Sequence, residues 1–383
     1  MKTKTIVLGG NHHNTLGVVR SLGQSNVHPI VYIPDKNLHK SFVFKSRYVS
    51  ESHVFHDYDE CIEHLVHHFH AEDNKPVVIC TSDHAISCVD KNYNRLKDLF
   101  CLPGCGKQGV LNHLMNKEVM GDLAKRVGFT LPNHCIVNGD KIPDNINYPC
   151  ITKPLSSVAG HKSDIHICKN VDDLINALKD KNKDDITQIQ DYIDIEFEYQ
   201  LIGCSLNGGS NVIIPGYTRI IRSEKGSNTG FLEYRPIQEL DYDDHKCTEF
   251  IKACNYSGLF SLEFIRGKDG CDYFLEINFR NDGNAFAVTG AGVNLPIIWV
   301  KFCSGESIEN ELKNAVKSIY VMPEFMDCVH VLKKRISLSL WLKDVRRTEC
   351  FFYYNKKDMS PFWCKLRETI KVAGKSGIKK IFC

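Results

Sequence analysis

The strongest constraint on the fold is a pair of adjoining strand-like segments late in the chain. The stretch "FSLEFIRGKDGCDYFLEINFR" (260–280) predicts a β-hairpin around the turn "GKDG" (267–270). Because side chains alternate along a strand, Glu276, Asn278 and Arg280 project together to one face, and the apolar residues between them to the other. A surface strand with one wet face shows the same alternation, so the pattern alone leaves both interpretations open.

The predicted register of the hairpin favours a metal site. If Arg266 faces Cys271 across the turn, Glu263 faces Phe274, and Glu276 then lies diagonally across from Glu263 on the same face. Two carboxylates and the neighbouring amide converge, and like charges repel unless a cation lies between them. Oxygen ligands of this kind favour Mg²⁺, which takes one or two carboxylates together with phosphate oxygens and water.

Composition places the chain among ordinary globular proteins. Its 383 residues suffice for two or three domains. The 17 cysteines are scattered and odd in number, which favours reduced thiols over a disulfide framework. No run of about 18 apolar residues occurs, and "MKTKTIVLGG" leads into a strand without a cleavage site. We therefore expect a cytoplasmic protein.

The first hundred residues alternate between strand and helix patterns. "TIVLGG" (5–10), "HPIVYIP" (28–34) and "PVVICTSD" (76–83) are short apolar strands, and helical spacing separates the first two. This βαβ pattern predicts a parallel sheet with ligand-facing loops at the strand ends. "GGNHHNTLG" lacks the G-x-G-x-x-G fingerprint, so a dehydrogenase is disfavoured.

Two metal-like patterns have plainer explanations. In "DECIEHLVHHFHA" (59–71) the histidines lie opposite an apolar helical stripe, and no third zinc ligand is nearby, so we interpret them as a solvated face. Cys101 and Cys105 lack a second cysteine pair at zinc spacing and are interpreted as thiols that flank a turn.

The parts of a nucleotide site follow residue 110. Lys117 opens an amphipathic helix (116–132), and Lys153 ends the strand "YPCITKP" (148–154). The small and polar residues of 155–164 suit a loop that wraps phosphates with backbone N–H groups. Further along the chain, Arg222 is a candidate clamp for a phosphate or a substrate carboxylate.

The order of these parts resembles the ATP-grasp superfamily over about residues 1–300, and "EINFRNDGNAFAVTGAGVNLP" looks most like its carboxylate–amine ligases, with D-aspartate ligase-like enzymes as near relatives. The resemblance implies ATP and Mg²⁺, which Mn²⁺ can replace. The implied phosphate-binding residues, with their covering loop, are Lys117, Lys153, Ser156, Ser157, Gly160 and Lys162. The implied adenine and ribose contacts are Gln190, Asp191, Ile193 and Glu198, with Glu196 as the alternative ribose ligand. The implied metal ligands are Glu263, Glu276 and Asn278, and the catalytic residues Lys153 and Arg280.

The resemblance also implies the fold class and the activity. We expect an α/β and α+β protein in which an N-terminal parallel-sheet (pre-ATP-grasp) domain, 1–112, precedes a two-lobed ATP-grasp fold, 113–310, with lobes at about 113–195 and 196–310. The implied reaction is amide or peptide bond formation through an acyl phosphate, with release of ADP and phosphate, on an amino acid or a cell-envelope precursor. A non-catalytic nucleotide sensor or scaffold is the alternative.

The C-terminal extension, 311–383, lies outside the resemblance. From Lys333 onward it carries 14 Lys/Arg against 4 Asp/Glu, whereas residues 1–332 carry 34 against 42. Aromatic residues interleave with these cations, as in a segment that rests on an anionic membrane surface, and a solvated element packed on the protein body is the alternative. No motif for reading nucleic-acid sequence is present. We expect small-molecule partners, peripheral membrane contact through 333–383 and a homodimer.

Overall fold

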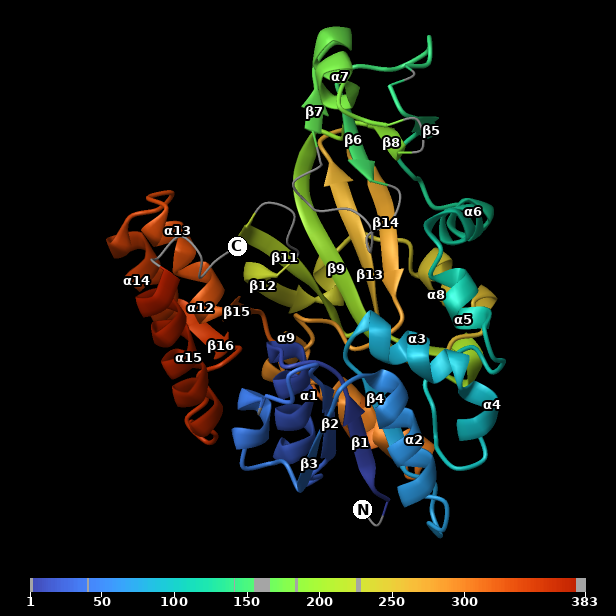
Figure 1. Cartoon of the computed structure of the whole chain (residues 1–383), viewed down its shortest axis with the longest axis vertical. Helices are drawn as coiled ribbons and strands as arrows, with labels where there is room; N and C mark the ends of the chain where they lie inside the picture. The colour runs from blue at the N-terminus through green and yellow to red at the C-terminus, as the bar shows by residue number, and fades with distance from the viewer. Residues whose placement is uncertain are drawn as a thin grey trace. The chain divides into compact units, whose positions relative to one another are not determined.

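The computed structural model describes residues 3–39, 41–140, 142–154, 166–182, 185–224 and 229–376 (Figure 1). The chain divides into two compact units. Unit 1 consists of Met1–Asn116, Tyr199–Leu262 and Ile277–Cys383, and unit 2 of Lys117–Glu198 and Glu263–Glu276. Each unit is therefore built from segments that are distant in the sequence.

Unit 1 begins with the expected parallel sheet. Its strands are β1 (Thr5–Leu8), β2 (Ile30–Pro34), β3 (Glu51–Phe55) and β4 (Val77–Cys80), in the order β3-β2-β1-β4. β1 and β4 are buried along their whole length, because a parallel sheet is covered on both faces. The accompanying helices are α1 (His13–Gln24), η1 (Phe42–Lys45), α2 (Tyr58–His68), α3 (Asp83–Lys91), α4 (Tyr93–Leu96) and α5 (Val110–Leu114).

In its described residues, unit 2 contains a four-stranded antiparallel sheet and the helices α6 and α7. The order is β5-β8-β6-β7, from β5 (His134–Asn138), β6 (Cys150–Pro154), β7 (His166–Cys168) and β8 (Ile186–Asp191). α6 (Lys117–Val127) opens the unit, and α7 (Val171–Leu178) packs Leu174 and Leu178 against Cys150, Cys168 and Ile189 of the sheet. One face of this sheet is thus a small apolar core.

An eight-stranded sheet contains the predicted hairpin. Its order is β14-β13-β9-β11-β12-β15-β16, with β10 paired to β9. The strands are β9 (Ile195–Leu206), β10 (Asn211–Ile213), β11 (Gly216–Ser223), β12 (Gly230–Pro236), β13 (Gly258–Gly267), β14 (Asp272–Asn278), β15 (Ile319–Met322) and β16 (Thr348–Phe351). Short helices connect them: η3 (Asn207–Gly209), η4 (Ile237–Glu239), α8 (Asp244–Ala253), α9 (Phe286–Gly290), α10 (Leu295–Cys303) and α11 (Glu309–Leu312).

The C-terminal segment adds strands to this sheet as well as helices. β15 pairs antiparallel with β12, and β16 pairs parallel with β15. Four helices lie around these strands: α12 (Glu324–Asp327), α13 (Val329–Leu332), α14 (Leu338–Arg347) and α15 (Ser360–Ser376) (Figure 1). Among the helices of the described residues, none is both long and apolar enough to cross a membrane.

Candidate nucleotide and metal site

Three charged residues that the sequence singled out come close together in unit 2. Lys117 is the first residue of α6, Lys153 lies near the end of β6, and Glu276 lies on β14. Burial and the nearby charge of Lys117 lower the pKa of Lys153 to about 8, against the opposing effect of Glu276. Two cations and a carboxylate within electrostatic reach are a suitable arrangement for a metal-bound polyphosphate.

The packing of Phe129 holds α6 beside the hairpin. The ring of Phe129, which follows the helix, stacks on Phe274 of β14 with centroids 5.1 Å apart, and it meets Phe264 of β13 edge-on. The backbone N–H of Phe274 also donates to the carbonyl of Thr130 at 2.9 Å. These contacts fix where Lys117 starts its helix relative to Glu276.

The second face of the unit 2 sheet carries the polar groups. Lys153 lies directly opposite Gln188 on β8, and Ile151 lies opposite Gln190, so these four side chains share one face. Gln188 and Gln190 are both buried. The sequence interpretation chose Gln190 and missed Gln188, although the period of two along the strand relates them.

The side chain of Asp191 lies on the other face of the sheet from that of Gln190. It lies opposite Cys150, on the face that packs against α7, and its carboxylate accepts hydrogen bonds from Asn133 (2.8 Å) and Asn147 (3.5 Å). Since Lys153 is on the opposite face, only the backbone of Asp191 is available to a nucleotide held there. Ile193 lies half-buried in the link between β8 and β9.

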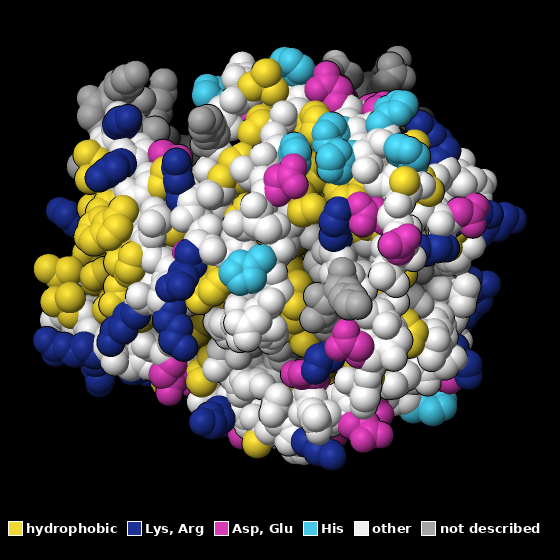
Figure 2. Space-filling model, turned by 90° about the horizontal axis from the view of Figure 1, so that it is seen from below, with side chains coloured by type: hydrophobic (Ala, Val, Ile, Leu, Met, Phe, Trp, Pro, Cys, Tyr) yellow, Lys and Arg dark blue, Asp and Glu magenta, His cyan; other side chains and the backbone are white. Residues whose placement is uncertain are grey.

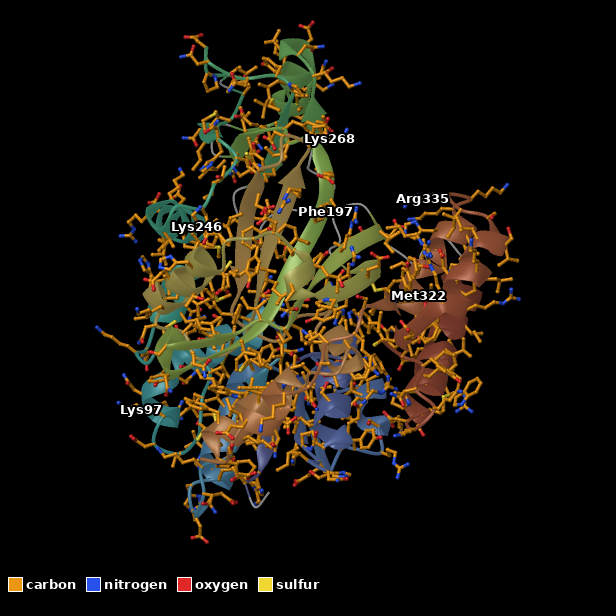
Figure 3. The ribbon with its side chains drawn as sticks, turned by 180° about the vertical axis from the view of Figure 1, so that it is seen from behind. Lys97, Phe197, Lys246, Lys268, Met322 and Arg335 are labelled. Carbon is orange, nitrogen blue, oxygen red and sulfur yellow. The ribbon has the colours of Figure 1, made fainter. Side chains whose placement is uncertain are left out.

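Burial separates the two candidate ribose ligands on β9. Glu196 and Glu198 are two residues apart and share a face, while the ring of Phe197 between them lies 5.8 Å from the Arg266 guanidinium (Figure 3 labels Phe197). Glu196 is exposed, whereas Glu198 is partly buried, and this burial raises the pKa of Glu198. A partly buried carboxylate lies nearer the interior than an exposed one, so burial favours Glu198 over Glu196 as the candidate ribose ligand.

The hairpin exists, but its register at the turn differs by one residue from the prediction. The N–H of Gly267 donates to the carbonyl of Cys271 at 2.9 Å, so Arg266 faces Asp272 and forms an ion pair with it (Nη2–Oδ2 2.8 Å). The reason is the three-residue loop, which ends in Gly270 at φ +81°, a conformation that glycine adopts readily.

Side-chain contacts join the two strands of the hairpin. Phe264 and Phe274 meet across the strands near the turn, and Ser261 Oγ lies 3.4 Å from Asn278 Nδ2 at the far end.

The donor set fits Mg²⁺ chemically. Glu263 and Asn278 are 6% and 8% exposed, and two carboxylates with an amide oxygen are hard donors of the kind that Mg²⁺ prefers. In the described part of the chain, no group of three or more His, Cys, Asp or Glu side chains could hold a metal ion. The set consists instead of two acids and an amide.

Arg280 is held in unit 1 by polar partners. Its Nε donates to Asp83 at the start of α3 (3.0 Å), its Nη2 to Asn278 Oδ1 (2.9 Å), and its Nη1 lies 3.4 Å from Asp282. Asp282 in turn accepts from Ser261 Oγ at 3.0 Å. The guanidinium is thereby positioned directly beside the proposed metal ligand Asn278.

His12 and His13 are adjacent and were not predicted as a pair; the residue as a whole is exposed for His12 and buried for His13. Desolvation of the ring and the charge of Arg280 lower the pKa of His12 to about 4, so this imidazole is neutral near pH 7. The ring of His13 packs on His12 (centroids 3.8 Å apart) and on Phe352 (4.8 Å), and neither of its nitrogens has a hydrogen-bond partner among the described residues. The βαβ pattern predicted ligand-facing loops at the strand ends but gave no reason to choose His13.

One predicted residue has another role, and four lie outside the part of the chain that the structure describes. Arg222 bonds both oxygens of Asp327 (2.9 and 2.7 Å) and also contacts Asp344, so its guanidinium is engaged by buried carboxylates and the predicted phosphate clamp does not hold. The loop residues Ser156, Ser157, Gly160 and Lys162 lie outside the described residues.

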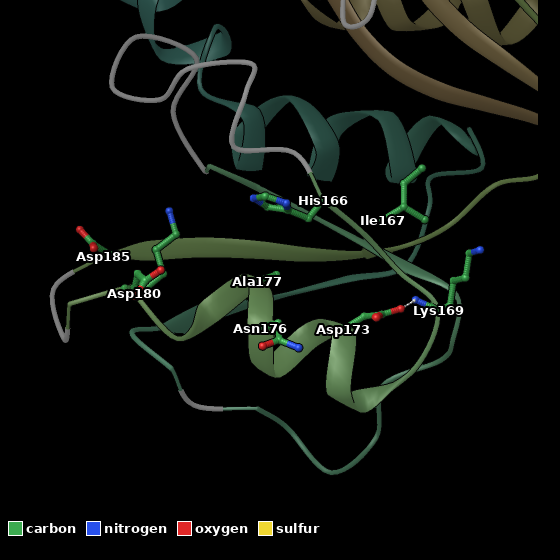
Figure 4. Close-up of a pocket in the computed structure, with 9 residues that line it drawn as sticks. His166, Ile167, Lys169, Asp173, Asn176, Ala177, Asp180 and Asp185 are labelled. Carbon is green, nitrogen blue, oxygen red and sulfur yellow. Dashed lines mark hydrogen bonds between the residues drawn. The ribbon is translucent and has the colours of Figure 1, made fainter.

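An open pocket elsewhere in unit 2 is distinct from these groups. It has a volume of about 690 Å³ and lies beside α7 and β7, where Figure 4 shows His166, Asp173 and Asp180 among its lining side chains. The Lys169 N–H donates to Asp173 at 2.9 Å, which caps the start of α7. None of the described site residues predicted from the sequence lines this pocket.

Comparison with known proteins gives one relative by sequence. No family model matches the chain. The D-alanine–D-alanine ligase of Geobacillus thermodenitrificans is 28% identical over 235 residues, which cover 55% of this chain and 61% of that ligase. The match thus spans less than two thirds of the relative.

Solved structures of low sequence identity share the fold. The L-amino acid ligase of Bacillus licheniformis has a TM-score of 0.58 at 14% identity, covering 82% of this chain and 76% of its own. The N5-carboxyaminoimidazole synthetase of Staphylococcus aureus has a TM-score of 0.65 at 15% identity, covering 87% of this chain and 86% of its own. The biotin carboxylase of Campylobacter jejuni has a TM-score of 0.61 at 16% identity, covering 82% of this chain and 74% of its own. The chain therefore has the ATP-grasp fold, and the predicted fold class is confirmed.

Proposed function

We propose that this chain is an ATP-dependent carboxylate–amine ligase that forms an amide or peptide bond and releases ADP and phosphate. The observation that carries the proposal is the convergence of Lys117, Lys153 and Glu276 in one unit, with Glu263 on the adjoining strand of the hairpin. The ATP-grasp fold and the names of two relatives, a D-alanine–D-alanine ligase and an L-amino acid ligase, support it.

The proposed roles in nucleotide binding follow the placement of the side chains. Lys117 and Lys153 bind phosphate oxygens. The adenine is lined by Gln190, the backbone of Asp191 and Ile193. Glu198 holds the ribose. Glu263, Glu276 and Asn278 would hold Mg²⁺, which when bound neutralises charge on the phosphates. The loop containing Ser156, Ser157, Gly160 and Lys162 is proposed to cover the phosphates on the strength of the sequence alone.

The proposed chemistry requires little covalent help from the protein. A carboxylate is a poor electrophile, so phosphoryl transfer from ATP first makes an acyl phosphate, which an amine attacks with loss of phosphate. Arg280, fixed by Asp83 and Asn278, is placed to stabilise charge on the transferring phosphoryl group or to bind the acid. Exclusion of water protects the acyl phosphate from hydrolysis.

The acid and the amine are proposed only as classes. Both named ligase relatives point to amino acids, and the resemblance to D-aspartate ligase-like enzymes adds a cell-envelope precursor as the larger substrate. The neutral His12 beside Arg280 offers an uncharged polar group next to a cation, which suits a substrate that carries both an amine and a carboxylate.

Hydroxamate formation tests the proposal. Purified protein is incubated with ATP, Mg²⁺, hydroxylamine and a panel of amino acids, because hydroxylamine traps an acyl phosphate. We expect one or a few acids to give hydroxamate, and Glu276→Ala to lower the turnover by about tenfold or more, since it removes a proposed metal ligand.

The matched control is Glu249→Ala. Glu249 lies on α8 with its side chain 43% exposed, and its substitution should leave the turnover unchanged. Turnover of Glu276→Ala equal to wild type at saturating Mg²⁺ contradicts the site assignment. Tight ATP binding without hydroxamate from any acid favours the nucleotide sensor instead.

Two associations are also proposed. A homodimer has a precedent in the biotin carboxylase domain dimer of Hydrogenobacter thermophilus, and light scattering on the purified chain tests it. The excess of cations in residues 333–383 supports peripheral contact with an anionic membrane surface, which sedimentation with lipid vesicles tests.

A further inference from the structure

α14 leaves part of its apolar side exposed. Leu338, Trp341, Leu342 and Val345 recur at intervals of three and four residues and therefore lie on one side of the helix. On a helix of a globular protein such a stripe normally faces the core. Here Leu338 is 58% and Leu342 42% exposed, and Trp341 and Val345 are only half-buried.

The buried residue of this helix is a charged one. The side chain of Asp344 is 2% exposed, contacts Arg222 and accepts from Arg347 at 2.9 Å. Arg222 also bonds Asp327, whose side chain is fully buried, at 2.7 Å, and lies 4.4 Å from the centre of the Phe231 ring. Ion pairs thus hold α14 through Asp344, Trp341 and Val345 are half-buried beside it, and Leu338 and Leu342 are left exposed.

Cations surround the exposed part of the stripe. Leu332, 51% exposed at the end of α13, is followed directly by Lys333, Lys334 and Arg335, and α14 itself carries Lys343 and Arg346. Figure 3 labels Arg335 in this part of the chain, and Figure 2 shows hydrophobic side chains beside Lys and Arg on the side where α12–α15 lie. Glu224 forms ion pairs with Lys333 and Arg335 at 2.8 Å each.

The positive charge around α14 distinguishes two possible partners for this surface, a second copy of the chain and an anionic lipid bilayer. A second copy docked by two-fold symmetry would bring the same cations against each other, and like charges oppose such a contact. An anionic lipid bilayer offers negative headgroups to the cations and an acyl boundary to the leucines, as interfacial helices require.

We infer that residues 332–346 form a docking surface for an anionic lipid bilayer, with Leu338 and Leu342 inserted and the flanking lysines and arginines on the headgroups. This inference deepens the proposed peripheral contact by naming the element that makes it, and it does not depend on the ligase activity. The buried ion pairs of Asp344 present the stripe in a fixed orientation, so no refolding of α14 is needed to dock.

Sedimentation with vesicles tests the inference on the full chain. The probes are vesicles of phosphatidylcholine alone and of phosphatidylcholine mixed with phosphatidylglycerol. We expect binding only to the mixed vesicles. Leu338→Ser with Leu342→Ser, and separately Lys343→Gln with Arg346→Gln, should each lower the vesicle-bound fraction by about tenfold, because apolar insertion and charge both contribute.

Leu312→Ser is the matched control. Leu312 is 45% exposed on α11 but lies beside the acidic Glu309 and Glu311, and its substitution should leave binding unchanged. ATP binding by every variant checks that it has folded. If the Leu338→Ser, Leu342→Ser variant binds the mixed vesicles as well as the wild type does, the inference about α14 is wrong, although the proposed membrane contact is retained. Absence of wild-type binding to either vesicle, or a dimer that the double-serine variant abolishes, overturns both.

Discussion

Lys153 is the residue whose environment most directly links structure to activity. It lies on the polar face of the unit 2 sheet, and burial together with Lys117 lowers its pKa to about 8. A lysine with a lowered pKa is charged below that pH and neutral above it. Its attraction for phosphate is therefore complete near pH 7 and is lost as the pH rises through 8.

We predict that kcat/KM for ATP falls by about tenfold from pH 7 to pH 9, because a lysine of pKa 8 retains about a tenth of its protonated form at pH 9. Lys153→Arg should flatten this profile, since arginine stays charged. Lys268→Arg, at a hairpin position with a 62% exposed side chain, is the control and should keep the wild-type profile. A slope of the same size in Lys153→Arg rules out Lys153 as its source.

Local sequence pattern was sufficient for the residues whose position depends on one element. Lys117 at a helix start, Lys153 at a strand end and Glu276 on an alternating strand each follow from periodicity. Gln188 could have been found by the same period-two rule. His13 could not have been found from a local pattern, because its ring packs on Phe352, which is far away in the sequence.

At the scale of elements, buried charge determines how the C-terminal helices are oriented. Arg222 on β11 joins Asp327 at the end of α12 to Asp344 in α14, and both carboxylates are essentially inaccessible. These partners are 105 and 122 residues away from Arg222, so no local pattern indicates them in preference to a phosphate. Burial without a partner is costly, so each charge depends on the others.

Asp327→Ala should lower the free energy of unfolding by about 3–5 kcal/mol, because it leaves Arg222 without its bidentate partner in a largely buried position. Urea titration measures this change. The matched control is Asp194→Ala, which removes an exposed pair with Lys268 and should cost less than about 1 kcal/mol. Equal costs for the two variants contradict the structural role assigned to Arg222.

The hairpin shows the limit of prediction within an element. Its existence and its polar face follow from the alternation in "FLEINFR", and both were predicted. The register of the hairpin was predicted wrongly by one residue. The choice between a four-residue and a three-residue loop depends on Gly270, which adopts a positive φ.

At the scale of the whole molecule, the two ends of the chain form part of one folded unit. Arg20 of α1 is fully buried, and its Nε donates to Asp358 at 2.9 Å while its other nitrogens reach the carbonyls of Phe352 and Tyr353. Asp358 also accepts from Ser46 at 2.8 Å. The sequence separated the C-terminal extension from the core by composition and charge, and composition carries no information about a partner 338 residues away. The boundaries at 113, 196 and 311 stay predictions.

Because Arg20 has no exposure, Asp358→Ala should cost about 3–5 kcal/mol in the free energy of unfolding, as the removal of one partner leaves a buried cation. Glu368→Ala, which removes a 37% exposed partner of Lys365 on α15, should cost less than about 1 kcal/mol. Hydrogen exchange then distinguishes a local from a shared effect. If the C-terminal segment and α1 form one cooperative unit, Asp358→Ala accelerates exchange in α1 as well as in α15. Faster exchange confined to residues 352–376 would mean that the segment unfolds independently, and that the N-terminal sheet does not depend on it.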